Sequence, residues 1–153
     1  MSISLRYCLD YELRDLIRIE RLCFAEPWTR REFQPFIERS RVLVAECNAT
    51  LDILGFAAYE VSRGEVRIVN MAVEPVAQRR GVGLALVNRL KDKLCPWKRR
   101  VLTALVPETN LAAHLFLRSC GFRGSVDPNG YLFRFDVADA PPPTLRLYKP
   151  SGA

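Results

Sequence analysis

The residues best suited to chemistry in this sequence form a basic, glycine-containing turn between an apolar stretch and a helical pattern. The turn, Gln78 to Gly83, contains two arginines and two glycines and follows a β-branched run that ends at Glu74-Pro75. Apolar residues then recur from Leu84 to Leu94 at the spacing of an amphipathic helix. A strand, such a turn and a helix together direct backbone N–H groups and a helix dipole at a phosphate. The segment therefore predicts a site for a phosphorylated cofactor.

The order of these residues excludes two common phosphate-binding signatures. A P-loop requires GxxxxGK followed by Ser or Thr, and the sequence contains no such run. A dinucleotide fingerprint requires GxGxxG, but Leu86 stands where its third glycine belongs. The remaining pattern is Gln-x-x-Gly-x-Gly with two arginines inside it.

The composition is that of a globular protein. The 153 residues are 49% hydrophobic and 26% charged, which predicts a single domain over residues 1–153. No apolar run approaches the roughly 20 residues of a transmembrane helix, and the first residues become charged too early for a secretory signal. Five scattered cysteines without a CxxC pair predict buried thiols in a reducing cytoplasm, and a single histidine adds no zinc-site spacing. We therefore expect a cytoplasmic protein without a metal and without a membrane partner.

The net charge of +6 is compatible with nucleic acid or an acidic partner, but its distribution argues against nucleic acid. The basic residues are dispersed, and the dense cluster outside the glycine turn, Lys98-Arg99-Arg100, precedes an expected strand as a solvated loop would. No RNA- or DNA-binding motif is present. An RNA-associated role is therefore the weakest of the alternatives.

Periodicity and turn signals predict the order β-α-α-β-β-β-α-β-α-β-β. Asp10 is expected to cap the first helix, which Pro27 ends, and Thr29 with Glu32 forms a capping-box pattern for the second. No internal repeat is apparent. The expected strands are 2–8, 41–46, 53–61, 66–73, 101–106, 131–137 and 144–148, the later helices are 83–94 and 110–119, and 139–143 is a proline-rich surface linker.

This order resembles, from end to end, the α/β (α+β) fold of the GNAT N-acetyltransferases, a mixed and mostly antiparallel sheet flanked by helices. The Gln78–Gly83 turn resembles their pyrophosphate-binding signature. The chain is also similar to the RimI-like branch, which acetylates protein N-termini. The residues that carry this narrower resemblance are Ile19-Glu20, Pro27-Trp28, Phe33, Asn70–Val73, Gln78–Gly83, Asn110 and Cys120–Phe122.

The resemblance implies acetyl-CoA as co-substrate and assigns roles around it. The glycines would let the backbone approach the pyrophosphate, the arginines would bind it, and the strand end would pair with the pantetheine arm. The N–H of Val73 would suit the thioester oxygen, and Asn110 would bind the arm or simply cap its helix. The implied cofactor-binding residues are Met71, Ala72, Val73, Gln78, Arg79, Arg80, Gly81, Val82, Gly83, Leu84 and Asn110.

The acid–base residues of RimI-like enzymes are absent. Their glutamate base corresponds to Leu105 and their tyrosine acid to Leu117, and neither leucine can move a proton. Glu108, His114, Tyr131 and Tyr148 are alternative candidates, although each also fits a helix turn or strand packing. A second interpretation is that little base is needed, since an α-amine with a pKa near 8 is already partly neutral at pH 7. A third is that catalysis is slow or absent.

These observations favour an N-acetyltransferase whose acceptor is a primary amine, plausibly a protein N-terminus. Two alternatives stay open: acetylation of a small-molecule amine, and a non-catalytic acyl-CoA-binding module. The acceptor pocket is expected between the Cys23–Phe36 region and the 123–143 segment, whose sequences do not identify the acceptor.

Overall fold

The computed structural model describes residues 1–139, which contain seven strands and four helices, and these follow the predicted order as far as the fourth helix. Short 3₁₀ turns lie at Asp10–Glu12 (η1), Pro75–Ala77 (η2) and Val137–Asp139 (η3). The elements are β1 (Ile3–Tyr7), α1 (Leu13–Cys23), α2 (Arg30–Glu38), β2 (Val42–Cys47), β3 (Ile53–Ser62), β4 (Gly64–Val73), α3 (Val82–Lys91), β5 (Arg99–Val106), α4 (Leu111–Ser119), β6 (Arg123–Asp127) and β7 (Gly130–Asp136).

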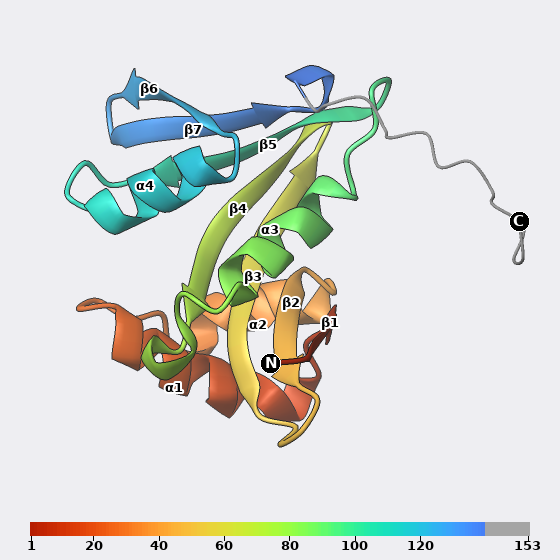
Figure 1. Cartoon of the computed structure of the whole chain (residues 1–153), viewed down its shortest axis with the longest axis vertical. Coiled ribbons are helices and arrows are strands. Elements are labelled where there is room, and N and C mark those ends of the chain that lie inside the picture. Colours follow the sequence, from red (N-terminus) through yellow and green to blue (C-terminus); the bar gives the residue numbers. More distant parts are fainter. Residues whose placement is uncertain (140–153) are drawn as a thin grey trace, which may run out of the picture.

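The strands form one mixed sheet in the order β1-β2-β3-β4-β5-β7-β6. β4 and β5 are parallel and all other neighbours are antiparallel. Two apolar clusters cover its faces: one joins α3 and α4 to the sheet, and the other joins α1 and α2 to β2 and β3 (Figure 1). Among the described helices, none combines the length and the apolarity needed to cross a membrane. The predicted mixed, helix-flanked sheet is thus confirmed.

The second helix begins as the sequence predicts. The backbone N–H of Thr29 donates to the Glu32 carboxylate at 2.9 Å, and the rings of Trp28 and Phe33 pack edge to face with centroids 5.2 Å apart. The first helix differs, because Asp10 lies inside η1 and does not cap it. The Glu12 carboxylate instead accepts the N–H of Leu9 at 2.8 Å, so the capping contact forms at Leu9, one residue before the predicted Asp10.

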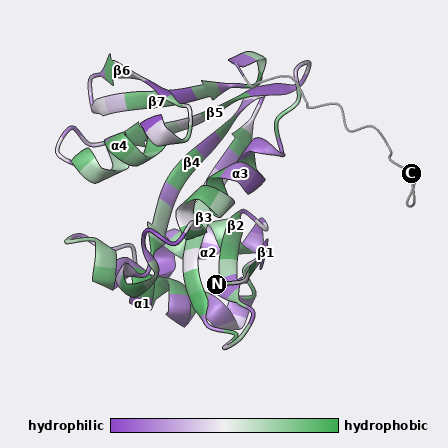
Figure 2. Ribbon diagram, in the orientation of Figure 1, coloured by the Kyte–Doolittle hydropathy of each residue, from purple (hydrophilic) through white to green (hydrophobic). Residues whose placement is uncertain are grey.

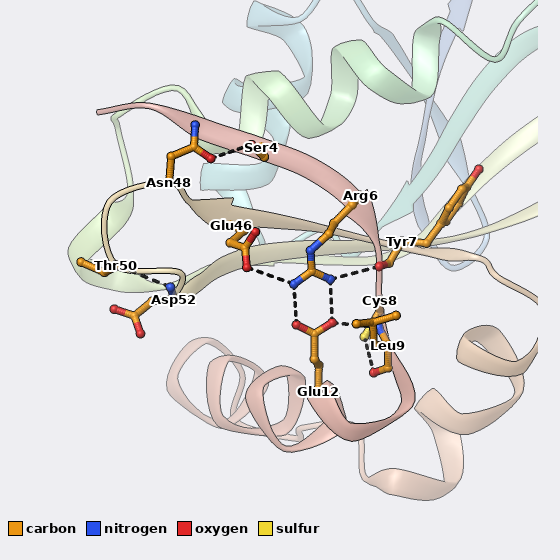
Figure 3. A network of polar contacts seen from close by, with 10 residues as sticks. All are labelled: Ser4, Arg6, Tyr7, Cys8, Leu9, Glu12, Glu46, Asn48, Thr50 and Asp52. Atoms are coloured by element: carbon orange, nitrogen blue, oxygen red, sulfur yellow. Dashed lines mark hydrogen bonds and ion pairs between the residues drawn. The ribbon is translucent and has the colours of Figure 1, made fainter.

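Glu12 also fastens the first strand to the sheet. The guanidinium of Arg6, on β1, binds both oxygens of Glu12 at 2.7 and 2.6 Å and reaches Glu46 on β2 at 3.2 Å (Figure 3). Only 7% of the Glu12 side chain is exposed. Since these hydrogen bonds favour the charged carboxylate, the Arg6 guanidinium lowers the pKa of Glu12.

The C-terminal strands differ from the prediction. The expected strand 131–137 is present as β7, but its partner is β6 at Arg123–Asp127, which is not among the strands that the sequence predicts. The side chains of β6 are nearly all exposed, so the strand lacks the apolar alternation that would reveal it. The turn at Asn129-Gly130 is the hairpin signal that was overlooked. The expected strand 144–148 and linker residues 140–143 lie outside the described residues.

Candidate active site

The site begins where two parallel strands diverge. β5 pairs with β4 only from Gly64 to Ile68, whereas β4 continues beside β3 as far as Val73. A register shift between β3 and β4 leaves Val69 as an extra residue, which is a β-bulge at the point of divergence. Bulges bend a strand and increase its twist, so this one directs β4 away from β5 (Figure 1). The edge of β4 from Val69 to Val73 is therefore not covered by β5.

Backbone alternation determines which groups this open edge presents. The N–H of Glu74 donates to Leu54 on the β3 side at 2.8 Å. Successive residues of a strand direct their backbone groups to opposite edges, so those of Val73 and Met71 face the opening. Those of Ala72 face β3, opposite Phe56. Of the three consecutive residues expected to pair with the substrate arm, only Met71 and Val73 therefore present their backbone groups to the open edge.

The basic turn joins this edge to the N-terminus of α3. Gly81 precedes the helix with φ of +86°, and Arg79 is also in the left-handed region at +63°. No side chain caps the helix, and the first bond within it runs from the N–H of Ala85 to the carbonyl of Gly81. Within residues 1–139 the backbone N–H groups of residues 82–84 therefore have no hydrogen-bond acceptor, and they lie at the positive end of the helix dipole, as an anion site requires.

A cavity of about 710 Å³, the main cavity, occupies the space between β4, the basic turn and α4. Arg80 and Val82 are the predicted cofactor residues that do not line it: Arg80 is exposed on the turn, and Val82 is buried in the core. The predicted residues that line it are Met71, Ala72, Val73, Gln78, Arg79, Gly81, Gly83, Leu84 and Asn110; the lining also contains Cys23, Phe24, Ala112, Ala113, Leu115 and Phe116.

Helix α4 supplies lining residues that the sequence reading missed. Leu111 and Leu115 lie one turn apart and are 66% and 61% exposed. Figure 2 shows that hydrophobic residues dominate this helix. A helix that buries one apolar face and exposes another has a second surface to cover. This all-round apolarity was the available signal for the part of α4 that lines the main cavity.

Gly83 lies where α3 comes close to α4. A Cβ at this position would lie 3.1 Å from the ring tip of Phe116 and 3.5 Å from the end of Met71. A larger side chain would therefore occupy the cavity. The absence of a side chain keeps the helix N-terminus open to a ligand.

Two side chains donate hydrogen bonds to the last backbone carbonyl of β4. The oxygen of Val73 accepts from Gln78 Nε2 at 3.0 Å and from the thiol of Cys23 at 3.3 Å. Burial raises the pKa of the Cys23 thiol, and the nearby carboxylates of Glu20 and Glu74 raise it further. Gln78 thus holds the turn against the strand end, and Cys23 brings the end of α1 to the same point.

Asn110 caps its helix and also lies at the main cavity. Its side-chain oxygen accepts the N–H of Ala113 at 3.2 Å, which caps α4, and the residue also lines the main cavity. Within residues 1–139 its side-chain nitrogen makes no hydrogen bond. The cap and a contact to a ligand therefore do not exclude each other.

The three acid–base candidates within the described residues, Glu108, His114 and Tyr131, are not among the residues that line the main cavity. Glu108 is exposed in the loop before α4, and His114 is buried with Nε2 3.0 Å from the carbonyl of Pro107. The ring of Tyr131 packs against His114 with centroids 5.0 Å apart. Tyr148 lies outside the described residues. These four assignments stay predictions.

The two leucines at the acid–base positions have different surroundings. Leu105 is 41% exposed on β5, whereas Leu117 is 5% exposed in the core beneath α4. Neither is among the residues found to line the main cavity in the described part of the chain. Position 105 has room for a polar side chain, and position 117 does not.

Glu20, which the sequence presents as a polar interruption of an apolar helix face, connects three elements. Its carboxylate accepts both hydrogen bonds of its contact with Asn70 on β4, at 3.0 and 2.8 Å, and the backbone N–H of Trp28 at 3.2 Å. Only 2% of the residue is exposed, and no ion pair balances it within residues 1–139. Burial raises its pKa, although these hydrogen bonds act in the opposite direction.

Comparison with known sequences identifies a family and close relatives. The family model described as acetyltransferase (GNAT) family matches residues 13–122. The [ribosomal protein bS18]-alanine N-acetyltransferase of Escherichia coli strain K12 is 32% identical over 115 residues, covering 74% of this chain and 76% of that protein.

Solved structures share the fold. The crystal structure of the ribosomal-protein-S18-alanine N-acetyltransferase from Escherichia coli superposes with a TM-score of 0.76 at 23% identity, covering 95% of this chain and 100% of that one. The PaiA N-acetyltransferase from Thermoplasma acidophilum, crystallised with coenzyme A, gives a TM-score of 0.70 at 16% identity over 89% of this chain and 99% of that one.

Proposed function

This chain belongs to the acetyltransferase (GNAT) family, and we propose that its acceptor is the α-amine of a protein N-terminus. It is an N-acetyltransferase that uses acetyl-CoA as donor. The proposal about the acceptor is supported by the 32% identical Escherichia coli relative, whose name gives an alanine of ribosomal protein bS18 as its target.

The chemistry at the missing acid–base positions supports the same acceptor. With leucine at 105 and 117, the amine receives no proton acceptor from either position. An α-amine has a pKa of about 8 and a lysine about 10.4, so at pH 7 the neutral fraction of an α-amine is roughly 200-fold larger. An enzyme with little general base is therefore suited to N-terminal amines and poorly suited to lysine. We further propose that this activity resides in a single domain, residues 1–153, in the cytoplasm.

For coenzyme binding, we assign the pyrophosphate to the N-terminus of α3. The free N–H groups of residues 82–84 face it, and Arg79 and Arg80 lie beside it on the exposed turn. The pantetheine arm extends along the open edge of β4, where Met71 and Val73 offer backbone groups as a neighbouring strand would. The free side-chain nitrogen of Asn110 donates to the arm from the other side of the main cavity.

For the reaction, we assign the oxyanion contact to Val73. Its N–H lies on the open edge, where it can donate to the thioester oxygen as negative charge develops there. The amine nitrogen bonds to the acetyl carbon, the carbon–sulfur bond breaks, the amine loses a proton to water and the departing thiolate gains one. Orientation along β4 and this hydrogen bond supply the acceleration.

A thiol-release assay tests the acceptor. The acceptors are a peptide with a free N-terminal alanine, the same peptide blocked at its N-terminus but containing lysine, and a polyamine. We expect release of coenzyme A thiol with the first peptide and at least tenfold less with the others at pH 7. Turnover of the polyamine alone would contradict the proposal and would assign the protein to small-molecule acetylation.

A further inference from the structure

A second cavity, of about 340 Å³, lies at the far end of α3 from the basic turn. It is bordered by Arg41 just before β2, the second half of β3, the start of β4, the segment after α3 and the start of β5. Val66 lines this cavity, and Val73, seven residues further along β4, lines the main cavity. Seven residues of a strand span roughly 20 Å, so the two cavities lie that far apart along β4. We call it the basic cavity, defined by Arg41, Tyr59, Lys93 and Arg99 in its lining.

Three cations of the basic cavity lack an anionic partner. Arg41, Lys93 and Arg99 are half-buried, and within residues 1–139 none of them forms an ion pair. The one acid in the lining is Asp92, which is exposed at the rim. Three positive charges therefore face one negative charge. Partial burial of unpaired cations is unfavourable, and an anion in the cavity would offset that cost.

The cations gather over tyrosines. Lys93 Nζ donates to the hydroxyl of Tyr7 at 2.8 Å and lies 5.5 Å from the centre of the Tyr59 ring. The guanidinium carbon of Arg41 lies 5.7 Å from the same ring. These contacts hold both cations at the wall of the cavity, because the ring faces attract positive charge.

Two buried polar atoms of the basic cavity also have no partner. Tyr59 is 1% exposed, and within the described residues its hydroxyl has no hydrogen bond of acceptable geometry, although the Tyr7 hydroxyl and the Lys93 ammonium are its neighbours; the buried Nε of Arg99 likewise has no partner there. Most buried polar groups in proteins are paired, so two such donors at one cavity require an explanation. Both orphaned atoms can donate to an acceptor, and both belong to residues that line the same cavity.

We infer that the basic cavity binds a small oxyanion, such as the phosphate group of a phosphorylated metabolite. Arginine guanidinium groups match the geometry of phosphate oxygens and donate charge-assisted hydrogen bonds to them. The two guanidinium groups and the ammonium only donate hydrogen bonds, and the hydroxyl can donate as well. A phosphate group offers several acceptor oxygens. The site is separate from the acetyl-transfer site, and it does not depend on the identity of the acetyl acceptor.

Inorganic phosphate is the probe for this inference. Because phosphate can also occupy the coenzyme's own anion site, it is titrated into protein saturated with coenzyme A, and calorimetry and thermal unfolding are both followed. We expect phosphate to raise Tm above the value in sodium chloride of equal ionic strength, since a ligand that binds the folded state stabilises it.

Matched variants localise the binding. Arg99→Met removes a cavity donor, and we expect phosphate affinity to fall on the order of tenfold; Lys98→Met removes an exposed neighbouring charge outside the lining, and affinity should be unchanged. Tyr59→Phe keeps the ring and removes only the orphaned hydroxyl, so it decides the matter if Arg99→Met does not fold. Phosphate that stabilises no more than chloride, or binds Tyr59→Phe and the native protein equally, would overturn the inference.

Discussion

Gly83 lies near Phe116 of α4 at the N-terminus of α3 and lines the main cavity, so a large side chain there would enter the cavity. We expect Gly83→Leu to weaken acetyl-CoA binding by at least tenfold, because the side chain meets Phe116 and Met71 and displaces the ligand from the free N–H groups. The measurement is the dissociation constant for acetyl-CoA by calorimetry.

Asn88→Leu is the matched control for Gly83→Leu. It places the same side chain on an exposed position of the same helix, so it tests whether leucine disturbs α3 itself. We expect its acetyl-CoA affinity to equal that of the native protein. Unchanged binding in Gly83→Leu would show that the coenzyme does not lie at this helix N-terminus.

Leu105 offers a gain-of-function experiment. Its side chain is 41% exposed, so Leu105→Glu introduces a carboxylate without burying it in the core. If a carboxylate at this position can take a proton from the acceptor amine, it should increase the rate most for amines that are mostly protonated at the assay pH. We expect thiol release with a lysine peptide to rise by about tenfold or more at pH 7, and release with an α-amine peptide to rise less.

Leu105→Gln separates basicity from shape. Glutamine has nearly the same size as glutamate but cannot accept a proton at this pH, so its rates should match those of the native protein. Equal rates for Leu105→Glu and Leu105→Gln with every amine would remove position 105 from the reaction.

At the scale of elements, Glu20 holds the segment between α1 and α2 against β4. Its pKa is raised in the folded protein, so the folded state keeps a proton that the unfolded chain has already released. The stability associated with this proton is present below the ordinary glutamate pKa, near 4.3, and is lost as the pH rises through the folded value. For Glu20→Gln we expect the free energy of unfolding to lack this decrease with rising pH.

The measurement is chemical denaturation at a series of pH values from 4 to neutrality. Glu26→Gln, in the exposed part of the same loop, is the control and should retain the pH dependence of the native protein. A Glu20→Gln profile parallel to the native one would mean that Glu20 does not titrate differently in the folded and unfolded states.

Arg6 and Glu12 predict the opposite dependence on pH. Arg6→Met leaves the Glu12 carboxylate buried without its partner, which we expect to cost about 3 kcal/mol at pH 7. Because Arg6 lowers the pKa of Glu12, the contribution is present above the ordinary glutamate pKa and is lost as the pH falls through the lowered value. The difference between variant and native protein should therefore shrink in acid, as measured by denaturant unfolding.

Arg67→Met provides the comparison for Arg6→Met. Arg67 pairs with Glu65 at 3.1 Å, but 45% of its side chain is exposed, and such surface pairs contribute less than about 1 kcal/mol. Equal losses in the two variants would show that burial of Glu12 is not what makes its ion pair important.

Local signals in the sequence were sufficient to predict most elements. Thr29 with Glu32 fixed the start of α2, and the apolar run before Pro75 located β4, because both patterns act over a few residues. The strand β6 was missed since its exposed residues carry no periodic pattern. The bulge at Val69 also has no local signal, because it arises from the pairing of β4 with β3 and from its divergence from β5.

Only the donor side of the candidate site carries a local signal in the sequence. The basic turn and the end of β4 form one continuous segment, and most of their predicted residues line one cavity, although Arg80 and Val82 do not. Cys23 is the last residue of α1 and Phe24 follows it, and the contact of Cys23 with Val73 depends on how α1 packs on the sheet. The role of Glu20 has no local signal, because its partners, Asn70 and Trp28, are distant in the sequence or lie in a loop.

At the scale of the whole molecule, the main cavity separates two parts of one sheet. β4 and β5 pair over only a short stretch, and beyond it the space between them is bordered by the open edge of β4, the start of α3 and the start of α4. A ligand that contacts all three would connect the β1–β4 part to the β5–β7 part. Coenzyme binding should therefore stabilise the molecule as a unit.

We expect acetyl-CoA at 100 times its Kd to raise the free energy of unfolding by about 2.7 kcal/mol. In hydrogen exchange, protection should increase at the open edge of β4 and at both helix N-termini, because the ligand reduces local opening there. Gly83→Leu should show neither effect at the same concentration, whereas Asn88→Leu should show both. Protection confined to α3, with β4 and α4 unchanged, would mean that the coenzyme binds the basic turn without bridging the divergent strands.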